Sequence, residues 1–260
     1  MKAVILAGGL GTRMREETEF RPKPMVDVGG KPVLWHIMKI FAQQGVTDFV
    51  ILTGYKGEMI KRYFYEYAML NLDFKVKIGD RSTLEYYGSH EEDGWTVTVV
   101  DTGQLSLTGE RILRAREHIG NVPFFITYGD GIANVNLTQL LAVHSETQAA
   151  LTISTAKPRS RFGVVAMSED NLVDRFLEKP EGSEIVNIGY MVASSSIFDY
   201  LEPGGSLEEA PLAKLARKGL LAAHHHKGYW QAMDTMRELE TLNKDWNNGS
   251  APWITVDESR

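Results

Sequence analysis

The first stretch of the chain, residues 1–23, holds residue types whose spacing suits chemistry on an anion. An apolar run over residues 1–7 leads into Gly8-Gly9-Leu10-Gly11-Thr12-Arg13, and Lys23-Pro24-Met25 follows. A glycine backbone can approach a ligand closely and can point N–H groups at phosphate oxygens. Arg13 offers a forked cation and Lys23 a point charge, which hold phosphates in complementary ways. The pattern predicts a phosphate-binding loop after a buried strand.

This glycine spacing matches neither the dinucleotide fingerprint nor the P-loop. Taken alone, the loop fits a tight strand-to-helix turn with solvated basic residues equally well.

Two aspartates are candidate ligands for a hard cation. Asp130 stands between glycines directly after the apolar run 124–128, and Asp234 ends an aromatic-rich segment before a helix that we expect to begin near Thr235. Either carboxylate could instead cap a helix or a turn. The Gly-rich loop upstream favours the metal interpretation, because Mg²⁺ binds carboxylates together with phosphate oxygens.

Strands alternate with helices through the first half of the chain. We expect strands over residues 46–52, 74–78, 95–100, 124–128 and 150–155. This series predicts an α/β fold, a Rossmann-like mixed, largely parallel twisted sheet flanked by helices, with ligands at the carboxyl ends of the strands. We expect residues 81–94 to form a polar, irregular loop.

Beyond residue 156 the strands become short and turns crowd together. We interpret this part as antiparallel, sugar-binding elements added to the sheet, forming a second wall of a cleft. Residues 1–260 are expected to form a single domain, with residues 1–135 mainly nucleotide-binding and residues 136–260 mainly sugar-phosphate-binding. The pair Glu178-Lys179 could bind sugar hydroxyls and a phosphate, although such pairs are usually solvated surface charges.

Composition limits the function classes. The net charge of −6 gives no sign of a nucleic-acid surface, and the lack of cysteine excludes disulfide and thiol chemistry. No apolar run approaches ~20 residues, and no signal peptide is visible. We therefore expect a cytoplasmic protein without a membrane or nucleic-acid partner.

The Gly-rich loop with Lys23-Pro24-Met25 resembles the signature of the sugar-1-phosphate nucleotidylyltransferases. Within that family the chain looks most like the subgroup that uses CTP and α-D-glucose 1-phosphate. The resemblance covers nearly the whole chain, and further matching segments are 30–38, 99–103, 127–131 and 228–235. Ala232 stands where the family usually has proline, which is expected to loosen the geometry before Asp234.

The resemblance implies a reaction in which an oxygen of the sugar phosphate attacks the α-phosphorus of CTP in line and expels pyrophosphate. It implies Mg²⁺ held by Asp130 and Asp234, a homo-oligomer, and a role in nucleotide-sugar biosynthesis for bacterial dideoxysugar and O-antigen pathways. The implied catalytic residues are Arg13, Lys23, Asp130 and Asp234.

The implied nucleotide-binding residues are Leu6, Ala7, Gly8, Gly9, Gly11, Thr12, Arg13, Lys23, Thr102, Gly103, Thr108, Arg111 and Asp130. The implied sugar-phosphate-binding residues are Gly163, Glu178, Lys179, Asn187 and Gly189. On sequence alone, Thr108 fits the N-cap of a helix as well as it fits a base contact.

Two alternatives stay open. The same fold could use another substrate, as a thymidylyl- or uridylyltransferase or as a cytidylyltransferase for another sugar 1-phosphate. A non-catalytic module that only binds a sugar nucleotide is the second alternative, and the presence of all four catalytic residues argues against it.

Overall fold

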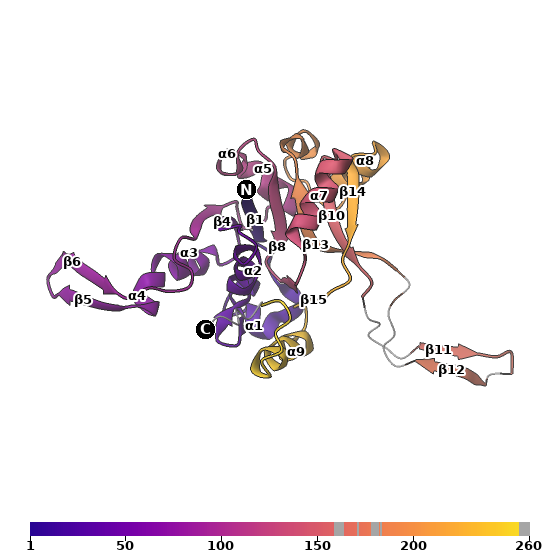
Figure 1. Cartoon of the computed structure of the whole chain (residues 1–260), viewed down its shortest axis with the longest axis horizontal. Helices are drawn as coiled ribbons and strands as arrows, with labels where there is room; N and C mark the ends of the chain where they lie inside the picture. Colours follow the sequence, from indigo (N-terminus) through magenta and orange to yellow (C-terminus); the bar gives the residue numbers. More distant parts are fainter. Residues whose placement is uncertain (159–163, 171, 178–181, 183, 255–260) are drawn as a thin grey trace.

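A seven-stranded sheet forms the centre of the computed structural model, which describes residues 1–158, 164–170, 172–177, 182 and 184–254 (Figure 1). Its strands lie in the order β14-β10-β13-β8-β1-β4-β7. In chain order they are β1 Lys2–Ala7, β4 Asp48–Thr53, β7 Thr96–Asp101, β8 Phe124–Tyr128, β10 Leu151–Ala156, β13 Val186–Ala193 and β14 Leu221–His225.

The sheet is mixed and largely parallel, as predicted. Strand β1 pairs in parallel with β4 and β8, and β7 continues the parallel series beside β4. Strand β13 runs antiparallel to both β8 and β10, so the antiparallel part lies within the central sheet. The carboxyl ends of β1, β4, β7 and β8 consequently share one edge, where open α/β sheets bind ligands.

Strand β1 is buried on both faces. Ala3 and Ile5 belong to one hydrophobic core cluster, whereas Val4 and Leu6 belong to the other. This alternation follows from the period of two along a strand, and it places a helical layer on each face. One layer comprises α2 Val33–Ala42, α3 Gly57–Tyr65, α7 Leu137–Thr147 and α9 Met236–Asn247, and the other comprises α5 Thr108–Arg114, α6 Arg116–Ile119, the 3₁₀ helix η3 Ser195–Tyr200 and α8 Ala210–Arg217.

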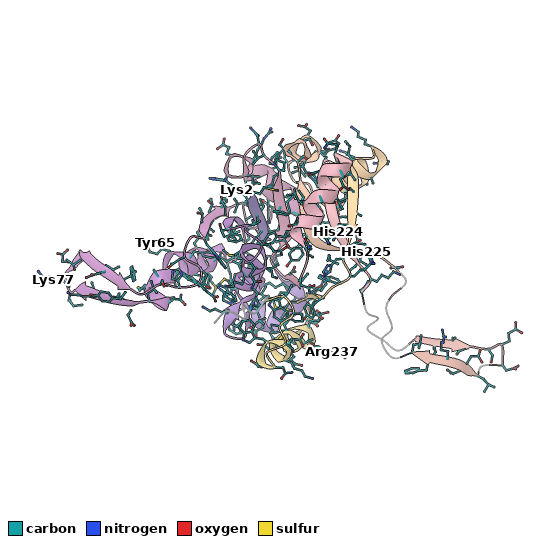
Figure 2. The ribbon with its side chains drawn as sticks, viewed as in Figure 1. Lys2, Tyr65, Lys77, His224, His225 and Arg237 are labelled. Atoms are coloured by element: carbon teal, nitrogen blue, oxygen red, sulfur yellow. The ribbon has the colours of Figure 1, made fainter. Side chains whose placement is uncertain are left out.

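An arm formed by α4 Tyr67–Asn71, β5 Asp73–Lys77 and β6 Asp80–Tyr87 extends away from the sheet (Figures 1 and 2). The prediction that residues 74–78 belong to the central sheet is wrong, because all of β5 is exposed and pairs only with β6 among the described residues. The strand beside β4 at this edge of the sheet is β7. The prediction of an irregular loop over 81–94 is also wrong for residues 81–87, which form the return strand of this hairpin.

A second hairpin, β11 Val164–Met167 paired with β12 Val173–Leu177, confirms antiparallel structure in the second half. The remaining short elements are η1 Thr12–Met14, α1 Arg15–Thr18, η2 Lys23–Met25, β2 Asp27–Val28, β3 Lys31–Pro32, β9 Gly131–Ala133 and β15 Trp230–Ala232. None of the helices in the described ranges has the length and apolar character needed to span a membrane.

Candidate active site

The Gly-rich loop begins where β1 ends, at Ala7, and leads into the 3₁₀ turn η1. Gly8 needs its hydrogen side chain, because a Cβ there would lie 2.2 Å from Arg111 Nη1. The Gly8 carbonyl accepts a hydrogen bond from Arg111 Nη2 at 2.9 Å. The loop is therefore closed against the side chain of a residue on α5.

Arg111 is only 4% exposed and acts as a brace beneath the loops. Its Nη1 donates to the carbonyls of Thr53 and Gly103 and to Thr102 Oγ1, at 2.8–3.0 Å. Burial lowers its pKa. The Thr102 side chain is fully buried and donates to the Thr53 carbonyl. Both side chains thus position the loop after β7, and the Thr102 side chain does not reach the cavity.

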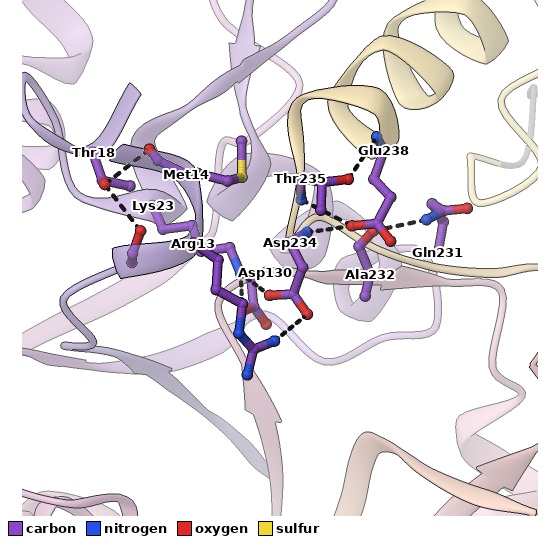
Figure 3. A network of polar contacts seen from close by, with 11 residues as sticks. Arg13, Met14, Thr18, Lys23, Asp130, Gln231, Ala232, Asp234, Thr235 and Glu238 are labelled. Atoms are coloured by element: carbon purple, nitrogen blue, oxygen red, sulfur yellow. Dashed lines mark hydrogen bonds and ion pairs between the residues drawn. The ribbon is translucent and has the colours of Figure 1, made fainter. Parts of the chain in front are cut away.

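Lys23 joins the two predicted metal ligands (Figure 3). Its Nζ lies 2.7 Å from Asp130 Oδ2 and 2.6 Å from Asp234 Oδ1. Arg13 Nη1 donates to the other oxygen of Asp234 at 2.7 Å. All four residues predicted to be catalytic therefore lie within one ionic network.

Strand pairing brings together carboxylates that are about a hundred residues apart. Strand β15 runs antiparallel to β9, with Ala232 opposite Gly131, and the next backbone bond runs from Met233 N to the Asp130 carbonyl at 2.9 Å. Asp130 lies two residues after the end of β8. Between them, the backbone N–H of Gly129 donates to the Leu6 carbonyl of β1 at 3.0 Å. Asp234 thus reaches the edge of the sheet through the short β9–β15 ladder.

The alternative role of Asp234 as a helix cap is taken by Thr235. Thr235 Oγ1 accepts from Glu238 N at 3.3 Å, and Glu238 Oε2 accepts from the backbone N–H groups of Asp234 and Thr235. This capping box begins α9 and fixes the backbone of Asp234 while its carboxylate contacts Lys23 and Arg13. The backbone at Asp234 is thus anchored although Ala232 replaces the usual proline.

Opposing influences set the protonation of Lys23. Burial lowers its pKa, but the charge of Asp130 and the hydrogen bonds to Asp130 and Asp234 raise it more, so the net pKa lies above the ordinary value. The ammonium therefore stays charged at neutral pH and offsets the two carboxylates.

The network lies on the wall of a cavity of about 430 Å³. The predicted site residues along it are Leu6, Ala7, Gly8, Gly9, Gly11, Thr12, Arg13, Lys23, Thr108, Arg111, Asp130 and Asp234. The cavity also has Ser106, Tyr128, Ser206 and Glu208 on its wall, none of which was among the predicted site residues.

Glu208 is the centre of a polar cluster that sequence reasoning missed. Its carboxylate accepts hydrogen bonds from the hydroxyls of Thr108, Tyr128 and Ser206. The N-cap position of α5 is Leu107, so the capping role considered for Thr108 is wrong: its hydroxyl bonds to Glu208 and to Leu207 N instead. Residues 205–208 pack on α5 at Gly109, where a Cβ would lie 2.9 Å from the Gly205 carbonyl oxygen. The sequence around Glu208 has no local pattern that would predict its contact with α5.

Three of the predicted sugar-phosphate residues, Gly163, Glu178 and Lys179, lie outside the described residues. The other two lie on β13, where Asn187 Oδ1 accepts from Gly189 N at 2.9 Å. Gly189 has a φ of +87°, and a Cβ there would lie 2.4 Å from the Tyr128 ring. Strand β13 therefore passes directly behind a residue of the cavity wall.

The carboxylates of Asp130 and Asp234 suit Mg²⁺ by the chemistry of the donor set. Both place an oxygen on one cation, the Lys23 ammonium, so their charges already converge on a common point. Mg²⁺ takes one or two protein carboxylates and completes its shell with phosphate oxygens and water. The pair therefore fits this ion together with a phosphate-bearing substrate.

Several known proteins are similar to this chain over almost its whole length. The "Probable glucose-1-phosphate cytidylyltransferase" of Bacillus subtilis (strain 168) is 44% identical over 97% of this chain and 99% of its own length. The glucose-1-phosphate cytidylyltransferase of Salmonella typhi is 42% identical over 98% of this chain and 99% of its own length.

A crystal structure of HddC from Yersinia pseudotuberculosis shares the fold, with a TM-score of 0.69 and 25% identity over 94% of this chain and 99% of that one. The profile described as "Nucleotidyl transferase" matches residues 2–247. The chain therefore belongs to the nucleotidyl transferase family.

Proposed function

We propose that the protein transfers a cytidylyl group from CTP to α-D-glucose 1-phosphate, forming CDP-glucose and pyrophosphate. The observation that supports this most strongly is the network in which Lys23 joins Asp130 and Asp234 beside the Gly-rich loop. The substrates follow from the names of the two relatives that are 42–44% identical over nearly the full length.

The nucleophile in this reaction is a phosphate oxygen that is already anionic, so the protein needs no general base. Its contribution is positioning and charge neutralisation, as in other phosphoryl chemistry. We assign the leaving pyrophosphate to Arg13, whose guanidinium is largely exposed, and the α-phosphate to the buried ammonium of Lys23. Attack forms the new oxygen–phosphorus bond as the bond to pyrophosphate breaks on the opposite side.

Asp130 and Asp234 would hold Mg²⁺, which when bound supplies positive charge and Lewis acidity to the phosphates. For the sugar phosphate we propose Gly163, Glu178, Lys179, Asn187 and Gly189. For the nucleotide we propose the cavity residues of the Gly-rich loop together with Asp130 and Thr108, while Thr102, Gly103 and Arg111 hold the loop in place.

We also propose that the whole chain works as one domain in the cytoplasm, where nucleoside triphosphates are made, and as a homo-oligomer. The arm supports self-association, because an isolated two-stranded hairpin is at best marginally stable in water. Phe74, Val76 and Ile78 are exposed along β5 and the turn after it, and Tyr65 stands 92% exposed on α3 near the base of the arm (Figure 2). A second copy of the chain would cover these side chains.

A panel of four nucleoside triphosphates with glucose 1-phosphate and Mg²⁺ tests the proposed reaction, with pyrophosphate release as the readout. We expect the highest kcat/KM with CTP. A preference for UTP or TTP would replace the cytidylyl assignment by a uridylyl- or thymidylyltransferase activity. If no pyrophosphate were released with any nucleotide and sugar 1-phosphate, the enzymatic function would be overturned.

A further inference from the structure

In the proposed function the four charged residues of the ionic network bind the phosphates and Mg²⁺, so we expect the base elsewhere along the same cavity. There the wall includes Ser106 from the loop before α5, Thr108 from the first turn of α5, and Tyr128, Ser206 and Glu208. Glu208 comes from the second half of the chain, in which we expected mainly sugar-phosphate contacts. Its carboxylate lies on the cavity wall although the residue as a whole is exposed.

The side-chain hydroxyls at this wall use their hydrogens within the protein. A carboxylate can only accept, so the hydroxyls of Thr108, Tyr128 and Ser206 must each donate their single hydrogen to Glu208. Ser106 Oγ donates to the Thr102 carbonyl at 2.5 Å. These four hydroxyls therefore present only lone pairs to a ligand, as Glu208 does.

Glu208 keeps its charge in this setting. Partial burial raises its pKa, but the hydrogen bonds from Ser206, Thr108 and Tyr128 outweigh burial and lower the net pKa below the ordinary value. A carboxylate offers about four lone-pair sites, and three hydroxyls from the described residues occupy three of them. Room for one further donor remains.

We propose that Glu208 selects the base of the nucleotide by accepting a hydrogen bond from the exocyclic amino group of cytosine. The proposal rests on the proposed function: if CTP is the substrate, N4 is the ring's only hydrogen-bond donor, and an acceptor wall can pair with nothing else on the base. Uracil and thymine carry a carbonyl oxygen at that position, which would face the carboxylate with like partial charge and no hydrogen to share.

The test compares Glu208→Gln with the parent and with Glu209→Gln, a matched control at the exposed neighbouring position. Glutamine keeps the shape and adds an amide donor that suits uracil O4. We expect the CTP/UTP ratio of kcat/KM to fall by about 10–100-fold in Glu208→Gln, the range typical of one base-edge contact, and to stay unchanged in Glu209→Gln.

Calorimetry with CMP and UMP measures the same base preference without turnover. The variant Glu208→Asp, which retracts the carboxylate by one methylene, should also lower the CTP/UTP ratio of kcat/KM. An unchanged preference in both Glu208 variants overturns the proposal. A changed dCTP/CTP ratio with an unchanged CTP/UTP ratio also overturns it, because it would assign Glu208 to the ribose. A parent that makes no sugar nucleotide contradicts the proposed function instead.

Discussion

Lys23 Nζ donates to Asp234 Oδ1 at 2.6 Å although the two residues are 211 positions apart. The contact links η2 to the residue directly before the N-cap of α9. A buried ammonium shared by two carboxylates is stable because each charge is paired, and removal of one partner leaves another charge uncompensated.

Replacement of Lys23 by alanine should lower the rate of the chemical step about 100- to 1,000-fold, a range typical of the loss of one transition-state contact. Its charge matters most as the α-phosphorus accepts the attacking oxygen, so CTP binding should weaken much less. Single-turnover kinetics and CTP titration separate the two effects, with Lys56→Ala as the control. Chemistry at the parental rate would show that Lys23 has no catalytic role.

Asp130→Asn and Asp234→Asn should each reduce activity steeply, because each removes a charge that would offset Mg²⁺ while keeping the side-chain shape. If both serve one ion, the double variant should lose little beyond the worse single variant, since groups that act as a unit are not additive. Raised Mg²⁺ should partly restore each single variant. Parental activity of Asp234→Asn at low Mg²⁺ would exclude it as a ligand.

Gly8→Ala and Gly9→Ala form a matched pair for the close packing under the Gly-rich loop. A Cβ at Gly8 would overlap the Arg111 guanidinium, whereas a Cβ at Gly9 would meet nothing within 4 Å. We expect Gly8→Ala to lower the free energy of unfolding by about 1–3 kcal/mol, as overpacking does, and Gly9→Ala to leave it nearly unchanged. Urea denaturation measures both, and equal values for the two variants would contradict the brace assigned to Arg111.

Stability should fall between neutral and acidic pH because of His36. Burial lowers its pKa from 6.5 to about 4, while its Nε2 lies 2.8 Å from the Val28 carbonyl and its Nδ1 accepts from Trp253 Nε1. Below pH 6.5 the unfolded chain binds a proton that the folded protein excludes, so stability is full above that pH and is lost as pH falls towards 4. The loss is on the order of 3 kcal/mol for this residue.

Urea denaturation at pH 7 and pH 4.5 measures this loss. A His36→Gln variant should start less stable and should show a smaller difference between the two pH values. An identical pH dependence in the variant and the parent would assign the acid sensitivity to other groups.

The first strand and the place of Asp130 could be predicted because their signals are local, whereas the convergence of Asp130 and Asp234 was expected only from the family resemblance. An apolar run over residues 3–7 before glycines marks β1, and glycines beside Asp130 mark the end of β8. The alternation over 74–78 indicated a strand correctly but could not tell which strand it pairs with, since period-two patterns do not encode partners. Its exposed side chains show that it belongs to the arm.

The roles of Glu208 and Arg111 could not be predicted from local sequence patterns. The role of Glu208 depends on residues 205–208 packing against α5, a contact across about a hundred positions. Arg111 was expected to contact the nucleotide, but burial and five carbonyl or hydroxyl acceptors commit its guanidinium to the loops. Two arginines can therefore have different roles: the buried Arg111 supports the loops, whereas the exposed Arg13 is accessible to a ligand. The sequence alone does not tell which arginine is buried.

The ionic network is electroneutral: the cations Arg13 and Lys23 balance the anions Asp130 and Asp234. A bare triphosphate would add several negative charges to a balanced site, and a bare divalent ion would add two positive charges. Arriving together, each offsets part of the other's charge. Nucleotide and metal should therefore bind synergistically, each raising the affinity for the other, and calorimetric titration of CTP with and without Mg²⁺ would reveal independent binding if this charge balance had no influence.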